Sequence, residues 1–354
     1  MIYLDSNATE RLRPEARAAA IAAMELAGNP SSVHAAGRQA RRMLEDARQT
    51  VASHVGAAPA EIVFCSGGTE ANALAIAGLS AGRRVIVGAT EHDSVRLAVS
   101  GAVVLPVLRT GQVDLPALQS LLRQGPALVC LMLANNETGV LHPVAEAAAL
   151  CRAHGALLHV DAVQAAGRIA FTLRQLGADS LAISGHKLGG LKGAGVLVLA
   201  PGLALAPQMA GGGQERGRRG GTPALPAIAG LAAAFDAAMA DPSRVAQLAA
   251  WRDHIEAGAD AIVCGSGQRL PNTTCLARPG LRSDMQVIAL DLAGIAVSAG
   301  AACSSGKVAR SHVLDAMGLG ELADCAIRVS LGWATTGDDV ERFLTAYARQ
   351  PVSA

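Results

Sequence analysis

The sequence predicts an α/β fold in which a mostly parallel sheet is covered by helices on both faces. Between about residues 60 and 200, short β-branched runs alternate with Ala-rich segments long enough for helices. Hydrophobic residues make up 51% of the 354-residue chain, which is enough for a large core. This length predicts about two domains. We expect a large domain over residues 14–242 and a smaller α/β domain built from residues 1–13 and 243–354.

The elements of the large domain follow from the apolar pattern. The expected strands are Glu61–Cys65, Arg84–Gly88, Ala127–Leu133, Ala156–Val160, Ser180–Ile183 and Gly195–Leu199. An amphipathic helix is expected before them at Val33–Val55, and an Ala-rich core helix after them at Ala224–Ala240. Beyond residue 242 the pattern changes to a long helix, short strands and a final helix near Asp338–Arg349, which indicates the second domain.

Composition argues against several classes of protein. The formal net charge is +1 and aromatic residues are 2% of the chain, so neither a nucleic acid nor an anionic membrane is an expected partner. The first residues lack the pattern of a signal peptide, and no clean membrane span is present. The seven cysteines show no C-x2-C spacing, which argues against a disulfide framework and a metal site. We expect a cytoplasmic protein without bound metal.

Polar residues are concentrated after five of the predicted strands. These segments are Ser66–Glu70, Glu91–Asp93, Asn135–Gly139, Asp161–Gln164 and Ser184–Lys187. In open α/β sheets, ligands bind beyond the carboxyl ends of the strands. We therefore expect the five segments to form one ligand site at one edge of the sheet.

The residue types at this edge suit pyridoxal 5′-phosphate (PLP). This cofactor needs an amine for a Schiff base and a carboxylate that keeps its pyridine nitrogen protonated, and Lys187 and Asp161 offer both. The Ser66–Thr69 turn before a helix suits a phosphate. Each feature also has a simpler interpretation. Lys187 could be an ordinary surface lysine, Asp161 could cap the following helix, and Ser66–Thr69 could be an ordinary helix cap.

Three further residues have roles to fill around such a cofactor. His92 is the candidate to stack on the pyridine ring and to exchange protons with the substrate. Gln164 and Asn136 are candidates to hydrogen-bond the ring hydroxyl and the imine region. A lone histidine is more often structural, so the prediction for His92 depends on its position after a strand.

A series of motifs runs in order through nearly the whole chain. They are Tyr3–Thr9, Gly28–His34, Ser66–Glu70, Thr90–His92, Asn135–Gly139, His159–Gln164, Ser184–Lys187, Gly211–Arg216, Gly221-Thr222, Ser298–Gly306 and Ile327–Gly332. With these motifs the chain resembles the cysteine desulfurases of the NifS/IscS-like family, which have PLP fold type I and belong to the class V aminotransferase group. The motif with Lys187 is common to the superfamily, whereas the segment with Cys303 separates desulfurases from other members.

The resemblance implies a role for each matching residue. Lys187 would form the Schiff base, Asp161 would pair with the pyridine nitrogen, and His92 would stack on the ring. The other residues expected to bind the cofactor are Gly68, Thr69, Asn136, Gln164, Ser184 and His186, together with Thr222, which would reach the phosphate held by the partner subunit of a homodimer. The residues expected to bind the substrate are Arg328, Asn136 and Asn7, with Arg328 on the substrate carboxylate.

The implied activity converts L-cysteine to L-alanine, with Lys187, Cys303 and His92 as the catalytic residues. Cys303 would take the sulfur as a persulfide and pass it to an acceptor protein, such as an iron–sulfur scaffold or a thiolation protein. Among the cysteines, Cys303 alone lies between small residues, with Lys307 and Arg310 nearby to favour the thiolate. A chance loop cysteine is the alternative.

Several other functions remain open on the same fold. A selenocysteine lyase or a cysteine sulfinate desulfinase could work without Cys303. An aminotransferase and a non-catalytic sulfur-relay scaffold are more distant possibilities. The chain also departs from the family at three positions, since Leu191, Gly220 and Trp333 stand where Pro, Ser and Arg are common.

Overall fold

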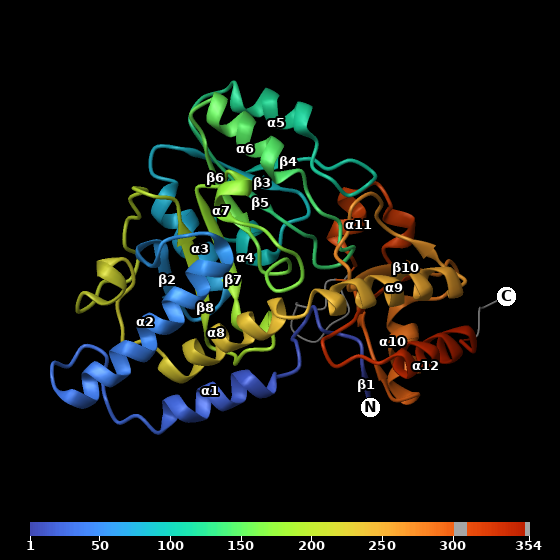
Figure 1. Ribbon diagram of the computed structural model, residues 1–354. Helices are drawn as coiled ribbons and strands as arrows, with labels where there is room; N and C mark the ends of the chain where they lie inside the picture. The colour runs from blue at the N-terminus through green and yellow to red at the C-terminus, as the bar shows by residue number, and fades with distance from the viewer. Residues whose placement is uncertain (301–309, 351–354) are drawn as a thin grey trace.

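A seven-stranded sheet forms the centre of the larger part of the molecule. The computed structural model describes residues 1–300 and 310–350 (Figure 1). In spatial order the strands are β2 (Ile62–Cys65), β8 (Gly195–Leu199), β7 (Ser180–Ser184), β6 (Leu157–Asp161), β5 (Ala127–Met132), β3 (Arg84–Gly88) and β4 (Val103–Leu105). Strand β8 runs antiparallel to β2 and β7, and the remaining pairs are parallel. The predicted α/β fold with a mostly parallel sheet is confirmed.

Helices cover both faces of this sheet because successive strand residues point to opposite sides. Ile62 and Phe64 belong to one apolar core, while Val63 and Cys65 belong to another. The first core is shared with α1 (Pro14–Met24), α2 (Ala35–Val55), α5 (Leu115–Leu122), α6 (Val144–Ala153), α7 (Leu173–Leu176) and α8 (Leu225–Met239). The second is shared with α3 (Gly68–Leu79) and α4 (Asp93–Arg96).

Helices α2 and α8 lie where long helices were predicted, and local features of the sequence explain their ends. Helix α2 begins after His34, whose ring accepts a hydrogen bond from the backbone N–H of Gly37, and it ends at Gly56 with a φ of 63°, a conformation that favours glycine. Pro226 falls in the first turn of α8, where a missing N–H costs little, so the Ala-rich helix continues past it.

The smaller part of the molecule combines both ends of the chain (Figure 1). Strand β1 (Ile2–Tyr3) pairs with β11 (Ile295–Ala296), beside a sheet of β12 (Ser298–Ala299), β13 (Ala326–Ser330), β10 (Thr273–Ala277) and β9 (Ile262–Val263). Its helices are α9 (Pro242–Gly258), α10 (Ser283–Leu292), α11 (His312–Ala316) and α12 (Gly337–Ala348). Because Ile2 and Leu4 pack into the apolar core of this smaller part, we propose the division into 14–242 and 1–13 plus 243–354.

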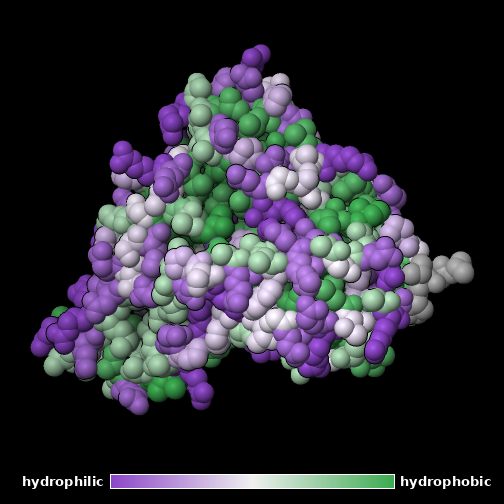
Figure 2. Space-filling model, turned by 45° about the vertical axis from the view of Figure 1, so that its right-hand side comes forward, coloured by the Kyte–Doolittle hydropathy of each residue, from purple (hydrophilic) through white to green (hydrophobic). Residues whose placement is uncertain are grey.

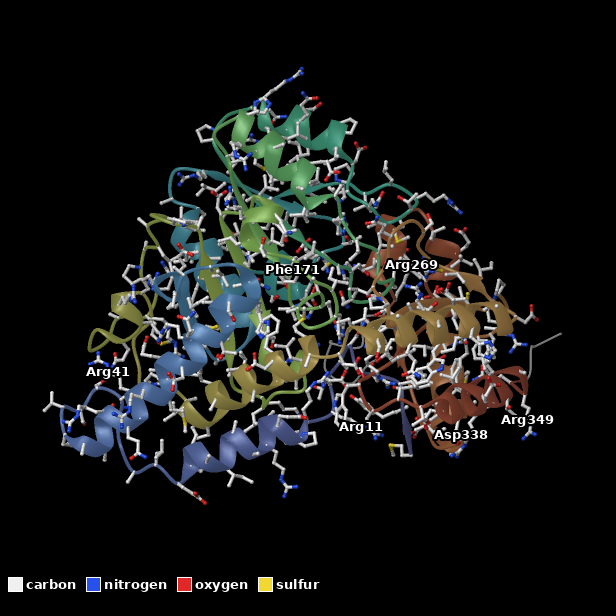
Figure 3. All side chains as sticks on the ribbon, viewed as in Figure 1. Arg11, Arg41, Phe171, Arg269, Asp338 and Arg349 are labelled. Carbon is white, nitrogen blue, oxygen red and sulfur yellow. The ribbon has the colours of Figure 1, made fainter. Side chains whose placement is uncertain are left out.

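The surface is of mixed polarity (Figure 2). Polar residues cover most of the face in Figure 2, with apolar residues in separate patches. Figure 3 places Arg41 at the far end of the larger part and Arg349 on the smaller part, while Phe171 lies in the core beside the large sheet. Within the described ranges, no helix is both long and apolar enough to cross a membrane.

Candidate active site

A cavity of about 300 Å³ lies at the carboxyl ends of β5, β6 and β7, a volume typical of small-molecule sites. Its lining residues are Ala8, Gly68, Thr69, Asn72, His92, Ser94, Met132, Ala134, Asn136, Asp161, Val163, Gln164, Ser184, His186 and Lys187. Most of the predicted site residues are among them. Asn7, Thr222 and Arg328 do not line the cavity, and Cys303 lies outside the described residues.

Lys187 reaches this cavity from the short 3₁₀ turn η2 (Gly185–Lys187) that follows β7. Its Nζ donates to the backbone carbonyls of Asn7, at 2.5 Å, and Ala8, at 2.9 Å. These carbonyls follow β1, so the start of the chain contributes to the site. The lysine amine is therefore held at the cavity by backbone oxygens, which is not the geometry of a surface lysine.

Asp161 ends β6, the strand beside β7, and only 7% of it is exposed. Its Oδ1 accepts the backbone N–H of Val163 at 2.9 Å, which is the local contact expected of a capping aspartate. Its Oδ2 accepts from the side-chain amide of Asn72 at 2.7 Å. The carboxylate is thus held from two sides while it borders the same cavity as Lys187.

His92 lies at the start of α4 and also borders the cavity. Its Nδ1 accepts the backbone N–H of Ser94 at 3.1 Å and lies 2.9 Å from the Ser94 hydroxyl. The histidine therefore has a structural role as a helix cap, and this cap also fixes the ring at the cavity wall.

One end of the cavity offers donors that suit a phosphate. Gly68 and Thr69 form the N-terminus of the 12-residue helix α3, whose dipole and N–H groups favour anions. A Cβ on Gly68 would lie 2.7 Å from the Val163 side chain, so a larger residue there would crowd the cavity wall. The Ser184 hydroxyl is buried at the cavity without a hydrogen-bond partner among the described residues. These groups, with Lys187 and Asp161, fit PLP.

His186 borders this end of the cavity, and its ring Nδ1 lies 2.8 Å from the Thr9 hydroxyl. Burial and the neighbouring Lys187 and Lys192 lower the pKa of His186 to about 4. The ring is therefore neutral near pH 7, and it can donate or accept but adds no full charge.

Gln164 is held by a buried arginine that the sequence interpretation missed. Arg168 donates to both the backbone and side-chain oxygens of Gln164, at 2.8 and 2.5 Å. The Gln164 amide nitrogen therefore points the other way, and it donates to the Asn7 carbonyl at 3.0 Å. Burial lowers the pKa of Arg168 to about 10, which still leaves it charged at neutral pH.

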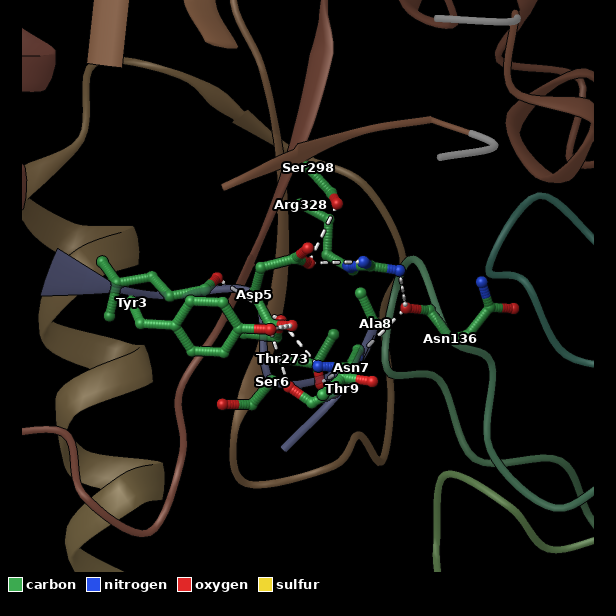
Figure 4. A network of polar contacts seen from close by, with 12 residues as sticks. Tyr3, Asp5, Ser6, Asn7, Ala8, Thr9, Asn136, Thr273, Ser298 and Arg328 are labelled. Carbon is green, nitrogen blue, oxygen red and sulfur yellow. Dashed lines mark hydrogen bonds and ion pairs between the residues drawn. The ribbon is translucent and has the colours of Figure 1, made fainter. Parts of the chain in front are cut away.

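Arg328, on β13, lies between Asp5 and Asn136 (Figure 4) and is not among the residues that line the cavity. It is 3% exposed, it forms an ion pair with Asp5 at 2.6 Å, and it donates to the backbone oxygen of Asn136 at 3.1 Å. The Asn7 amide donates to that same oxygen at 3.0 Å and to Thr273 at 2.9 Å. Arg328 and the Asn7 side chain therefore contact the site through Asn136, while the Asn7 backbone carbonyl accepts directly from Lys187.

Of the two remaining predicted site residues, Thr222 lies away from the cavity with Lys187, and Cys303 is outside the described residues. Thr222 is exposed and borders a separate cavity of about 90 Å³, lined also by Cys65 and Arg219. The six cysteines within residues 1–300 and 310–350 are all buried and unpaired, and none lines the cavity with Lys187. Burial raises the pKa of Cys65 and Cys151 to about 12, which keeps them as unreactive thiols.

Sequence reasoning also missed Asn72 and Ser94. Asn72 lies three residues after Thr69 on α3, so the two face the same side of the helix, and this spacing could have indicated it. Ser94 had no comparable signal. Within the described part of the chain, no group of three or more His, Cys, Asp or Glu residues could hold a metal ion.

Comparison with known proteins gives one consistent family. Residues 2–343 match the family described as Aminotransferase class-V. The chain is 42% identical to a cysteine desulfurase of Cereibacter sphaeroides, over 97% of this chain and 94% of that protein, and 36% identical to cysteine desulfurase IscS of Dictyoglomus turgidum, over 98% and 94%. Among solved structures it is similar to a NifS-like protein of Rickettsia africae, with a TM-score of 0.91, 34% identity and 98% of both chains covered.

The chain belongs to the class-V aminotransferase family. The resemblance to the cysteine desulfurases within that family, with PLP fold type I, is confirmed by these relatives. Members of this family use PLP, which agrees with the fit of PLP to the cavity. A structure described as SspA in complex with cysteine is also similar, with a TM-score of 0.83 and 27% identity over 95% of this chain and all of that one.

Proposed function

We propose that this protein is a PLP-dependent cysteine desulfurase that converts L-cysteine to L-alanine. The observation that carries the proposal is that the Lys187 amine and the Asp161 carboxylate border one cavity, whose phosphate end has the Ser184 hydroxyl and the start of α3. When bound, PLP supplies an electron sink for carbanion chemistry.

The residues of the chain would divide the work at this cavity. Lys187 would hold the cofactor and move the substrate α-proton, and Asp161 would pair with the pyridine nitrogen. The backbone carbonyls of Asn7 and Ala8 hold the lysine amine in place. His92, capping α4, would stack on the ring and exchange a proton with the substrate thiol.

The substrate carboxylate would bind beside Asn136, at Arg328. In the described structure one Arg328 nitrogen pairs with Asp5 and another with the Asn136 carbonyl, while its Nε is buried without a hydrogen-bond partner among the described residues. These two contacts use two of the five guanidinium N–H groups, so donors remain for a two-pronged pair with a carboxylate. Asn7 would support Asn136 through its side-chain amide.

Cys303 would accept the sulfur as a persulfide, and L-alanine would leave. The other six cysteines support this assignment indirectly, because all six are buried and none borders the cavity. The sulfur would then pass to an acceptor protein, either an iron–sulfur scaffold or a thiolation protein.

The test is incubation of the protein with PLP and L-cysteine, followed by measurement of alanine and of a persulfide mass shift on the peptide that carries Cys303. Cys303→Ala should bind PLP with an unchanged visible spectrum and lose at least about 10²-fold in sulfide release, because the nucleophile is absent. The matched control is Cys151→Ala, a buried cysteine that does not line the cavity and should retain activity on replacement. Full sulfide release by the Cys303 variant would contradict the role and favour a selenocysteine lyase or a sulfinate desulfinase.

We also propose a homodimer in the cytoplasm. Thr222 is exposed and does not line the cavity with Lys187, so we place it at the phosphate held by a second copy of the chain. Six unpaired cysteines suit a reducing compartment. Light scattering should give twice the mass of one chain, and Thr222→Ala should weaken PLP binding. A monomer with full PLP affinity would contradict the dimer.

A further inference from the structure

Asn72 is a fully buried residue of α3 that borders the cavity and uses both ends of its amide. Its Nδ2 donates to the Asp161 carboxylate at 2.7 Å and to the Ser94 hydroxyl at 2.8 Å. Its Oδ1 lies 2.9 Å from Nε2 of His159, a fully buried ring in the middle of β6. Asn72 therefore joins a strand end, a helix start and the interior of the sheet.

The partners of Asn72 determine which way its amide points. A carboxylate only accepts hydrogen bonds, so the nitrogen of Asn72 must face Asp161, and the oxygen then faces His159. Burial lowers the pKa of His159 to about 3, so its ring is neutral with one proton, which lies on Nε2. Its Nδ1 must then accept from the Ser180 hydroxyl, 2.8 Å away. His159 thus holds Asn72 in one orientation from behind the cavity.

The second N–H of Asn72 connects the carboxylate to His92 through Ser94. Because the Ser94 hydroxyl oxygen accepts from Asn72, its own proton is directed to Nδ1 of His92, 2.9 Å away. The backbone N–H of Ser94 donates to the same Nδ1 at 3.1 Å. A ring nitrogen that accepts two hydrogen bonds carries no proton, so the proton of a neutral His92 lies on Nε2.

We propose that Asn72 is a positioning residue that joins Asp161 and His92 into one hydrogen-bonded unit, in which His92 keeps its ring proton on Nε2. The unit orients the carboxylate and sets the histidine tautomer together, before any ligand enters. Its consequence for catalysis rests on the proposed function, because the fixed Nε2–H would be a hydrogen-bond donor toward the substrate or the cofactor.

The first test uses nitrogen-15 NMR of the histidine rings in the protein before PLP is added. The His92 signals are identified by their loss in His92→Gln, and the wild type should show a protonated Nε2 and an unprotonated Nδ1. Ser94→Ala removes one of the two donors to Nδ1 and should shift the tautomer ratio by about fivefold toward Nδ1–H. Ser94→Thr keeps a hydroxyl and should restore the wild-type ratio. Ser120→Ala, a serine replacement on an exposed helix face, is the matched control.

The second test separates positioning from binding in the PLP-loaded protein. Ser94→Ala should lower kcat about tenfold with KM within threefold, since a misplaced group slows the chemical step more than it weakens binding. Ser94→Thr and Ser120→Ala should stay within twofold of the wild type. Asn72→Leu, which has a similar size and no amide, should in addition weaken PLP binding, because Asp161 loses a donor; if that variant fails to fold, the Ser94 pair decides.

An Nδ1–H tautomer in the wild type would overturn the proposal, as would an unchanged tautomer and kcat in Ser94→Ala. The NMR measurement needs neither PLP nor cysteine, so its result is independent of the activity. A wild-type protein that shows the Nε2–H tautomer but makes no alanine would disprove the proposed function and leave the hydrogen-bonded unit standing.

Discussion

One cavity lies at the amino ends of the parallel strands (the amino edge of the sheet) and another lies at their carboxyl ends (the carboxyl edge). The larger of the two is at the amino edge, away from the candidate site residues. The amino ends of the parallel strands border a cavity of about 420 Å³, lined by residues such as Ala156 and Asp179, which directly precede β6 and β7. The carboxyl ends border the cavity of about 300 Å³ with Lys187 and Asp161. Volume therefore does not identify the candidate site. What distinguishes the second cavity is a set of converging polar groups.

Helix direction explains why the two edges differ chemically. Helix α3 begins at the carboxyl edge, so its N–H groups favour an anion there. At the amino edge α2 ends at Val55 and its capping Gly56 lines the cavity, so carbonyl groups point to that side. Asp179 at that edge already has a local partner, since its carboxylate accepts the backbone N–H of Leu158 at 2.7 Å.

The largest expected effect is the loss of the amine at the carboxyl edge. Lys187→Ala should lose the visible absorption of bound PLP and at least about 10³-fold in turnover, because general acid–base catalysis alone contributes 10²–10⁴-fold. Lys192→Ala, an exposed lysine five residues later, should retain both. Absorption spectra and alanine formation measure the difference, and an unchanged spectrum in Lys187→Ala would refute the assignment.

A second, smaller effect compares one aspartate from each edge. Asp161→Asn should lower turnover by about 10²-fold, the cost of removing a charge aimed at a reacting centre. Asp179→Asn should change turnover less than about twofold, because its remaining oxygen can still accept the N–H of Leu158. Steady-state kinetics of the two variants test whether the edges are functionally distinct. Equal losses would remove the distinction.

The smallest effect concerns the stability of the carboxyl edge rather than its activity. Glu91 is fully buried, and this burial, with the nearby Asp161, raises the pKa of Glu91 well above its ordinary value. A raised pKa stabilises the folded protein below about pH 4.5, and this stability is lost as the pH rises. Glu91→Gln keeps the oxygen that accepts the backbone N–H of Met132. Its free energy of unfolding should therefore rise relative to that of the wild type as the pH goes from about 5 to about 8.

Urea denaturation at both pH values measures this change, and the wild type and Glu91→Gln should differ by less than about 1 kcal/mol at the lower pH. Glu25→Gln, on an exposed residue, is the control and should show no trend with pH. A stability difference that is the same at both pH values would show that Glu91 is ionised in the folded protein.

Most of the sheet could be predicted because its signals are local. Arg84–Gly88 and Gly195–Leu199 agree with the structure at both ends, and the other four predicted strands differ by one residue at one or both ends. Strand β4, Val103–Leu105, was not predicted, since it is short and its middle residue is exposed. The antiparallel direction of β8 was also not predicted, because direction depends on where the chain returns and not on the residues of the strand.

The candidate site could also be predicted in part. Residues that follow strands, such as Asp161 and Lys187, could be placed at one edge from their positions alone. Asn72 and Ser94 were missed because each acts through a contact with a residue distant in the sequence, Asp161 and Asn72 respectively. Arg168 was missed although its partner Gln164 lies only four residues before it.

The sequence by itself determined the alternation of strands and helices, the edge at which polar residues gather and the family of the chain, because periodicity and motif order are properties of neighbouring residues. The tertiary structure decided which way each polar group points. The Asn72 amide is oriented by His159 and Asp161, and the Lys187 amine is held by carbonyls from the start of the chain. Such orientation arises only when distant segments pack together and buried donors must find acceptors.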